Sequence, residues 1–508
     1  MDLAEEPRGR VCQATQSSNN DTAVHRTLKA TRCFPIFSHC ANSSSSLAVA
    51  VRVYGQYLMQ IGGLCAFFTV LGIGAAASEP TMGDTSNQTA ADAAGWLFPV
   101  EHVNRALPHW IRFGGEYRLR IESEDGIGFT TTNDVYLLSR FRFNVNIKPT
   151  QWLTFFGETQ DARIFFNHHV PTDPSFQNSW DVRQAYVQLG SAKEGWVDLI
   201  AGRQVLAFGD ERVIGPSDYT NTARTFDAVR LDLHHDRNRV GLFASSVVVS
   251  RDGVVDHHNQ GNNLYGAYGS LEHIVPRATL EPYVLWRVAP ANNVLTASRL
   301  PGSLSEVTTG VRLAGALPGG FDYDIEMDKQ TGSLGSRSVD AWAGYWSLGR
   351  TFQSAAATPR VFIESQYASG TKNSNGGTWN TFDEIYPSNH DKLGFADLVG
   401  RRNIQQIRAG VEETISKRWK LRQAYESFWL ATTGDAFYGN SGSISVPANP
   451  SATSRHVGQE VDLIAQYKVA DGVTAGFGYA RFFTGQFLKQ SSRGKDYNYP
   501  FIYLDYHF

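Results

Sequence analysis

Arginine residues recur at alternate positions of several predicted strands, so they share the polar face of each strand. A guanidinium group stays protonated and can bind a carboxylate in a two-pronged geometry, and rings of basic side chains favour anions. The candidate anion-binding residues are Arg112, Arg118, Arg120, Arg140, Arg142, Arg203, Arg212, Arg230, Arg312 and Arg408. Carboxylates such as Asp322, Asp324 and Glu326 fall on similar faces. Internal ion pairing is therefore an alternative role for these arginines.

No arrangement in the sequence predicts catalysis. Serine and histidine residues are plentiful, but none has the spacing of a catalytic triad, so an enzyme is the less favoured class. Adjacent histidines such as His168 and His169 would point to opposite faces of a strand, which disfavours a shared metal ion. Asp383 and His390 could bind a cation or order the loop that contains them, and we favour the ordering role. We predict no catalytic residue, metal site or cofactor.

The arginines are positioned by segments in which apolar and polar residues alternate. In residues 111–122, Phe113 and Leu119 fall on one face while Arg118 and Arg120 fall on the other. Successive side chains of a strand point to opposite sides, so this period of two indicates strands with one apolar and one charged face.

The chain ends on an alternating strand that closes with an aromatic residue. In Phe501–Phe508, the side chains of Ile502, Leu504, Tyr506 and Phe508 share one face. This pattern resembles the terminal signal that the bacterial outer-membrane assembly machinery reads, although a soluble all-β domain can also end in this way. The pattern favours a transmembrane barrel, in which only alternate residues face lipid.

The alternating segments are numerous enough to form one large barrel. No stretch of about 18 apolar residues is available to span a bilayer as a helix. The predicted strands are 110–122, 135–148, 152–165, 181–190, 196–206, 226–234, 238–249, 262–272, 278–287, 305–315, 320–330, 338–348, 359–368, 404–414, 418–430, 457–468, 472–484 and 498–508. Short connections such as His235–Arg237 alternate with long ones such as Ala207–Thr225 and Ala431–Arg455. The predicted fold class is all-β, a transmembrane antiparallel β-barrel of about eighteen strands with short periplasmic turns.

The first part of the chain contains a displaced export signal. Ile61–Ile73 is an apolar run too short to span a bilayer, Arg52 precedes it, and the small residues Ala75–Ser78 follow it. We predict a spurious or disordered extension over 1–50, a signal peptide over 51–78, a periplasmic lead-in over 79–109 and the barrel over 110–508. All four cysteines lie at or before Cys65, so the predicted mature chain has no thiol chemistry. The formal net charge of -3 gives no indication of nucleic-acid binding.

Two segments carry patterns more specific than strand alternation. One is Gly202–Pro216, G-R-Q-V-L-A-F-G-D-E-R-V-I-G-P, followed by Phe226–Arg230; the other is Thr381–His390, T-F-D-E-I-Y-P-S-N-H. At these segments the chain resembles the alginate export family of outer-membrane proteins, and the resemblance extends over about residues 100–508. The residues that carry it are Gly202, Gln204, Gly209, Asp210, Glu211, Gly215, Asp227, Phe382, Asp383, Tyr386, Pro387 and His390.

The first segment can also be interpreted without the family. Its glycines permit tight backbone near a strand end, and Arg203 and Arg212 offer compact charge pairing with Asp210 or Glu211. Two interpretations remain open: a salt-bridge network that braces a folded-in loop, and direct contact with a substrate.

The resemblance implies an eighteen-stranded monomeric barrel with a narrow, arginine-rich pore for an anionic polysaccharide. A periplasmic loop is expected to plug the exit of such a pore, but here the usual position, Val469–Asp471, is short, and the longest candidate is Gly349–Ala357. A gate at the usual place is therefore not expected.

We predict a channel that passes an anionic oligo- or polysaccharide, alginate-like in character, across the outer membrane. A porin for uptake of small anionic solutes is the alternative, and a surface receptor that uses the Ser369–Asn403 loop is a third class. The expected partners are outer-membrane lipid, the barrel assembly machinery and the anion, and no nucleic acid. The expected location is the bacterial outer membrane, reached by Sec-type export.

Overall fold

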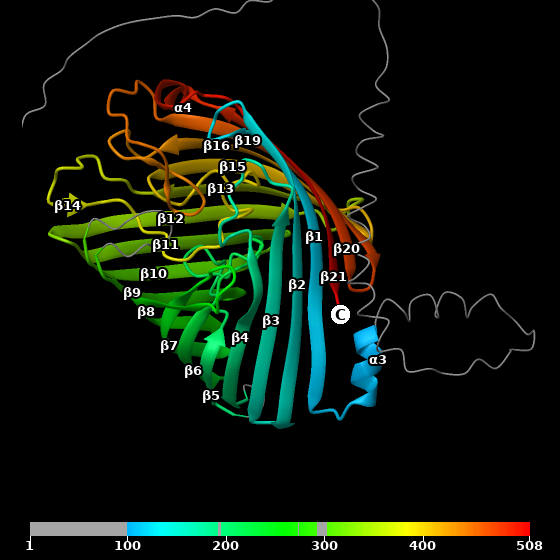
Figure 1. The fold of residues 1–508 in the computed structure, drawn as a ribbon. Helices are drawn as coiled ribbons and strands as arrows, with labels where there is room; N and C mark the ends of the chain where they lie inside the picture. Colours follow the sequence, from blue (N-terminus) through cyan, green and yellow to red (C-terminus); the bar gives the residue numbers. More distant parts are fainter. Residues whose placement is uncertain (1–98, 192–194, 273, 292–301) are drawn as a thin grey trace, which may run out of the picture. The chain divides into compact units, whose positions relative to one another are not determined.

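A single antiparallel sheet closes on itself in this protein, because its first strand, β1, pairs with its last, β21 (Figure 1). The structure, a computed structural model, describes residues 99–191, 195–272, 274–291 and 302–508, all within the unit Ser86–Phe508. In these residues the closed barrel has eighteen strands: β1 (Ile111–Ile127), β2 (Thr132–Thr150), β3 (Leu153–Phe165), β4 (Asn178–Gly190), β5 (Val197–Gln204), β6 (Phe226–His235), β7 (Asn238–Val249), β8 (His257–Glu272), β9 (Ala278–Ala289), β10 (Leu304–Leu317), β11 (Phe321–Leu334), β12 (Arg337–Thr351), β13 (Arg360–Ala368), β15 (Ile404–Thr414), β16 (Trp419–Leu430), β19 (His456–Ala470), β20 (Val473–Thr484) and β21 (Tyr497–His507). The predicted fold class is confirmed.

The remaining elements are not strands of the closed barrel wall. The two-residue strand β14 (Thr378–Trp379) pairs in parallel with β12, and β17 (Phe437–Tyr438) pairs with β18 (Ile444–Val446). The described part of the chain also forms two short helices, α3 (Pro99–Ala106) and α4 (Gln486–Ser491). The predicted extension 1–50 and signal peptide 51–78 lie outside the described residues, as does most of the predicted lead-in.

The outward face of the barrel wall is apolar and its inner face is charged, the reverse of the arrangement in a soluble protein. On the outward face of β21, the side chain of Ile502 is 50% exposed, whereas Arg140 on the lumen face of β2 is 1% exposed. Rows of exposed apolar side chains are unfavourable in water, but they match the lipid-facing band of an outer-membrane barrel. The part of the chain that the structure describes contains no helix long and apolar enough to cross a bilayer.

The register of the closing pair keeps these faces continuous. Leu119 lies opposite Leu504 on the outward face, and Arg118 lies opposite Asp505 on the lumen face. A shift of one residue would move every apolar side chain of β21 into the lumen, so the alternation of the sequence specifies this register.

The connections divide the barrel into two ends. At the end that we call the turn end, the strands are joined by short segments, including 151–152, 236–237, 318–320, 415–418 and 471–472, and the longest described one is 352–359. At the opposite, loop end lie the long connections 205–225, 369–403 and 431–455. The predicted alternation is incomplete, because 128–131 and 335–336 at the loop end are also short.

Four exposed tryptophans lie at the turn end. Trp110 precedes β1, Trp152 lies in the turn before β3, Trp196 precedes β5, and Trp419 begins β16. All four side chains are exposed. Tryptophan is favoured where a membrane meets water, so these residues are placed to form an interfacial girdle.

The last residue, Phe508, is anchored to the first strand. Its N–H donates to the Gly115 carbonyl at 3.1 Å, and its own carbonyl accepts from the Gly115 N–H at 2.9 Å. Its ring stacks on Phe141 with centroids 6.3 Å apart. Gly115 leaves room for this ring, since a Cβ there would lie 2.5 Å from it.

We therefore expect Phe508→Ala, or deletion of Phe508, to reduce the amount of folded protein in the membrane, because closure of the barrel loses its terminal aromatic contact. The heat-modifiable fraction on gels measures this loss. Phe166→Ala, at an exposed aromatic residue in the 166–177 connection, is the control and should assemble normally. Normal assembly of both Phe508 variants would contradict a role for the terminal aromatic.

Candidate functional site in the barrel lumen

The two sequence motifs meet inside the barrel. We call residues 205–225 motif loop 1 and residues 369–403 motif loop 2. The Tyr386 N–H donates to the Val213 carbonyl at 2.9 Å, and the Gly215 N–H donates to the Tyr386 carbonyl at 2.8 Å. These bonds form a short parallel bridge between segments that are far apart in the sequence.

Glycine is required at the close approaches of motif loop 1. Gly209 has φ +56°, and a Cβ there would lie 2.6 Å from the hydroxyl of Tyr268 on the barrel wall. At Gly215 a Cβ would lie 2.7 Å from the Glu211 Cβ and would also collide with Ser388 of motif loop 2. The motif glycines therefore let the loop pack against both the wall and its partner loop.

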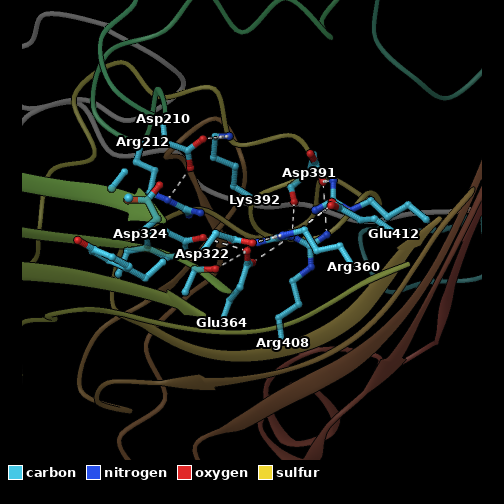
Figure 2. A pocket seen from close by; sticks show the side chains of 16 residues that line it. Asp210, Arg212, Asp322, Asp324, Arg360, Glu364, Asp391, Lys392, Arg408 and Glu412 are labelled. Atoms are coloured by element: carbon cyan, nitrogen blue, oxygen red, sulfur yellow. Dashed lines mark hydrogen bonds and ion pairs between the residues drawn. The ribbon is translucent and has the colours of Figure 1, made fainter. Parts of the chain in front are cut away.

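A charged cavity of about 390 Å³ lies between the motif loops and one side of the wall (Figure 2). The loops contribute Asp210, Arg212, Asp391 and Lys392, and the turn-end halves of β10 to β16 contribute most of the rest. Five of its lining side chains are basic, Arg212, Arg360, Lys392, Arg408 and Arg422, and six are acidic, Asp210, Asp322, Asp324, Glu364, Asp391 and Glu412. The net charge of this lining does not by itself favour anions, so selectivity depends on which groups remain accessible.

The accessible basic groups of the cavity belong to three side chains that the sequence analysis did not single out. Arg360 keeps 25% of its side chain exposed, Arg422 22% and Lys392 19%, whereas Arg408 is 1% exposed. Arg360 and Arg422 lie on polar faces of predicted strands, 359–368 and 418–430. Strand alternation could have found both of them, whereas Lys392 lies in a loop without periodicity.

Ion pairs form within the cavity wall and between the two motif loops. Arg360 lies 2.6 Å from Asp322 and 3.2 Å from Glu412 within the wall. Lys392 and Asp210 join the two motif loops at 3.1 Å. The cavity is therefore lined by alternating donors and acceptors.

Asp391 of motif loop 2 pairs with Arg408 at 3.3 Å and with Arg422 on the wall. Burial raises the pKa of the Asp391 carboxyl, but the charges of Arg422 and Arg408 more than offset this effect and hold the pKa well below its usual range. Asp391 is therefore ionised at neutral pH.

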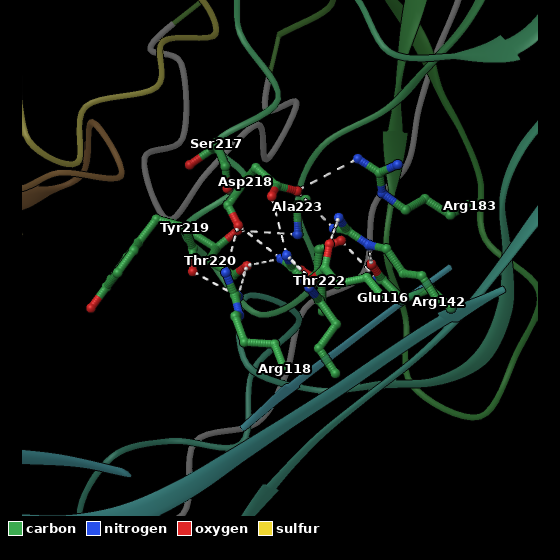
Figure 3. A network of polar contacts seen from close by, with 12 residues as sticks. Glu116, Arg118, Arg142, Arg183, Ser217, Asp218, Tyr219, Thr220, Thr222 and Ala223 are labelled. Atoms are coloured by element: carbon green, nitrogen blue, oxygen red, sulfur yellow. Dashed lines mark hydrogen bonds and ion pairs between the residues drawn. The ribbon is translucent and has the colours of Figure 1, made fainter. Parts of the chain in front are cut away.

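Four of the predicted arginines hold motif loop 1 in place, and Figure 3 labels two of them, Arg118 and Arg142. Arg118 donates to the carbonyls of Asp218, Tyr219 and Thr220 at 3.0–3.2 Å. Arg140 donates to the Asp218 carbonyl at 2.8 Å. The side chains of Arg120 and Arg142 reach the same segment, Arg120 at the Tyr219 carbonyl and Arg142 at the Asp218 carboxylate. All four are buried, and these contacts favour the bracing role over direct substrate contact.

The carboxylate of Asp218 is the charged partner in this network. Burial raises its pKa, but Arg140, Arg142 and Arg183 more than offset that effect, so the pKa lies well below its usual range. The loop is consequently held by charge-assisted hydrogen bonds throughout the neutral range.

The placement of Arg203 differs from the prediction that it lines the pore. On β5 it shares a face with the outward-facing Leu199 and Ala201, and it pairs with Asp227 at 2.8 Å. Asp227 in turn lies on the same face as Val229, which is 52% exposed. The period of two therefore places Arg203 and Asp227 on the outward face, near the loop end.

The other predicted arginines divide between the lumen and the rim. Arg230 pairs with Asp232 on the lumen face, and Arg312 pairs there with Asp324. Arg112 is exposed beside the start of β1 and donates to the Pro108 carbonyl. Arg212 stacks over the ring of Tyr345, 3.3 Å from its centroid.

The second motif orders motif loop 2. Asp383 pairs with Arg402 at 3.1 Å and also with Arg287 on the wall. His390 hydrogen-bonds Asp397 at 2.9 Å and stacks on the ring of Tyr219, with centroids 3.3 Å apart. These contacts support the ordering role that the sequence analysis favoured for Asp383 and His390.

The rest of the motif residues have packing or backbone roles. Phe382 is fully buried in the main apolar cluster, and the Pro387 carbonyl accepts from Arg224. Gln204 donates to the Ala228 carbonyl at 3.1 Å, and Gly202 has φ +127°. The two motifs thus belong to a pair of loops that fold into the lumen.

Comparison with known proteins identifies both the family and the fold. Residues 109–500 match the alginate export family. No curated protein matches the chain. Three similar solved structures are from Pseudomonas aeruginosa. OpdK with vanillate has a TM-score of 0.53 and 10% identity, covering 78% of this chain and 98% of that one. OpdQ has a TM-score of 0.52 and 13% identity, covering 78% of this chain and 98% of that one. OccK3 (OpdO) has a TM-score of 0.52 and 11% identity, covering 81% of this chain and 99% of that one. At these identities the likeness shows the fold alone.

Proposed function

The chain belongs to the alginate export family, and from this premise we propose that it passes an anionic oligo- or polysaccharide, such as alginate, through its lumen. The chain is an outer-membrane β-barrel channel. What is proposed is the chemical class of its substrate.

The alternating charges of the lumen cavity carry this proposal. A uronate sugar presents a carboxylate and several hydroxyl groups. The accessible guanidinium groups of Arg360 and Arg422 suit the carboxylate, and neighbouring acceptors such as Asp322 and Glu412 suit the hydroxyls. A small inorganic anion has no hydroxyl groups to donate to these acceptors. The acceptors therefore favour a saccharide substrate over a small inorganic anion.

We infer that no catalytic step is involved. We also infer a monomer, inserted by the barrel assembly machinery after Sec-type export.

The test is block of ion current in planar bilayers. Oligomers of a uronic acid should block the current, whereas neutral oligosaccharides of equal length should block it at least about tenfold more weakly, because each charge-assisted hydrogen bond contributes roughly 1.5–3 kcal/mol. The reversal potential in a salt gradient should show anion preference. Cation preference without block by the oligouronate would reject the proposal, and anion preference without block would favour the small-solute porin.

Replacing the accessible arginines should weaken this block. In Arg360→Gln, the carboxylate of Asp322 loses its ion-pair partner and that of Glu412 keeps only Arg422, so the cavity becomes more negative. We expect oligouronate block about tenfold weaker and a shift of the reversal potential toward cations. The matched control is Arg350→Gln, whose side chain packs over Phe321 and Phe352 at the turn end and which should behave as the unmodified channel. Equal block in both variants would show that the cavity does not bind the saccharide.

A further inference from the structure

Three carboxylates converge on the lumen face of two adjacent strands, apart from the cavity described above. Glu426 on β16 lies directly opposite Glu460 on β19, and Asp462 follows two residues later on the same face. One oxygen from each lies within 4.8 Å of the others. We call these residues the acidic triad.

The acidic triad is buried and short of donors. Glu426 and Glu460 are 0% exposed and Asp462 is 2% exposed. The Gln406 amide donates to one oxygen of Glu426, and the Ala396 N–H donates to one oxygen of Glu460 at 2.8 Å. Among the described residues, nothing donates to the second oxygen of either glutamate or to either oxygen of Asp462. Four carboxylate oxygens of the acidic triad are thus buried without a hydrogen-bond donor from the described part of the chain.

Positive charge near the acidic triad is insufficient to balance it. Of the ion pairs that the described residues form, one reaches the triad: Arg408 Nε lies 3.9 Å from Glu426. The same guanidinium also serves Glu364 and Asp391. Like charges directly opposite each other in a sheet are destabilising, and buried charges need partners. Either the carboxyls share protons or a cation neutralises them.

We propose that the acidic triad binds a divalent cation, with Ca²⁺ the best fit. The ligands of Ca²⁺ lie at roughly 2.4 Å, so two oxygens bound to one ion are at most about 4.8 Å apart. One oxygen from each residue of the acidic triad lies within this limit of the others. Ca²⁺ accepts bidentate carboxylates in irregular geometry, whereas Mg²⁺ requires a near-ideal octahedron. Three carboxylates and one shared guanidinium leave a net charge of about minus two, which one divalent cation balances.

The bound cation would also join a motif loop to the wall. Motif loop 2 passes directly over the triad: Gly394 has φ +90°, and a Cβ there would lie 2.5 Å from a Glu460 oxygen. Ala396 of the same loop already bonds Glu460. Neutralising the triad would therefore fasten this loop and remove three negative charges from the lumen. The site does not depend on which solute the channel carries.

The experiment uses the full chain, folded in detergent, stripped with a chelator and titrated with CaCl₂ by calorimetry. We expect about one Ca²⁺ per chain with a Kd at or below about 1 mM, and a higher midpoint of thermal unfolding in Ca²⁺ than in chelator. Asp462→Asn and Glu460→Gln should weaken binding at least about tenfold. Glu158→Gln, which changes a buried lumen carboxylate paired with Arg183, is the matched control and should bind as the unmodified chain does.

The outcomes separate a cation from shared protons. If the unmodified chain takes up no Ca²⁺ and its midpoint rises only as the pH falls, the carboxyls share protons and the proposal is overturned. If binding persists undiminished in Asp462→Asn, the ion lies elsewhere and the proposal is also overturned. Should a variant fail to fold, the titration of the unmodified chain, with Mg²⁺ as the weaker competitor, still decides whether a site exists.

Discussion

Shortening motif loop 1 should raise the single-channel conductance several-fold. The loop crosses the lumen, from Asp218 on the β1–β2 side to Arg212 beside Tyr345 on the β12 side. Removing residues 212–222 would clear this path while leaving the eighteen wall strands intact, because the wall is held by its own ladders. Conductance in planar bilayers is the measurement.

The control for this deletion is loss of 253–255 from the connection between β7 and β8. Val254 and Val255 are exposed there, so shortening this tip should leave conductance unchanged. Equal conductance of the motif loop 1 deletion and the unmodified channel would show that the loop does not restrict the pore.

A point variant distinguishes bracing from substrate contact. If Arg140 braces the loop, Arg140→Gln should increase conductance and current noise, because the Asp218 and Thr220 carbonyls each lose one of two donors and keep Arg118. If Arg140 instead contacts substrate, the variant should weaken oligouronate block at unchanged conductance.

The pH dependence of the loop follows from Asp218. Its pKa is lowered in the folded state, so the stabilisation is fully present above the ordinary carboxyl pKa of about 4 and is lost as the pH falls through the lower, folded value. Conductance should therefore stay constant from about pH 5 to 8 and rise only in acid. A rise near neutral pH would contradict this account of the network.

Placing a charge on the outward face should block assembly. Phe141 lies midway along β2 and contacts Phe508 and Trp180 on the outward side, so Phe141→Arg places a cation near the membrane midplane at a cost of roughly 2–4 kcal/mol. We expect little heat-modifiable protein from this variant. Phe141→Leu, which keeps an apolar side chain, should assemble normally.

Substitution of the neighbouring residue, Arg142, should leave assembly intact if β2 has the register described above. Arg142 faces the lumen and is 5% exposed, so Arg142→Gln should assemble and alter only the loop network. Normal assembly of Phe141→Arg together with failure of Arg142→Gln would mean that the two faces of β2 are exchanged, since a slip of one residue swaps them.

Strand alternation was sufficient to predict the wall of this protein. All eighteen strands lie within a few residues of their predicted positions, because lipid on one side and a polar lumen on the other impose a period of two on each strand. Short elements without that period were not predicted: β14, β17, β18 and the helix α4. Alternation also placed Arg118, Arg140 and Arg408 on the lumen face. Applied to β5, the same alternation puts Arg203 on the outward face with Leu199 and Ala201, so it excludes Arg203 from the pore lining.

The contents of the lumen were decided only by the tertiary structure. The sequence shows two motifs, but their pairing through Val213 and Tyr386 joins segments separated by eight wall strands, and no local pattern reports such a contact. The same holds for the acidic triad, because Glu426 meets Glu460 only through the register of β16 with β19. A side chain's face follows from its own strand, whereas its partners depend on how distant loops and strands pack together.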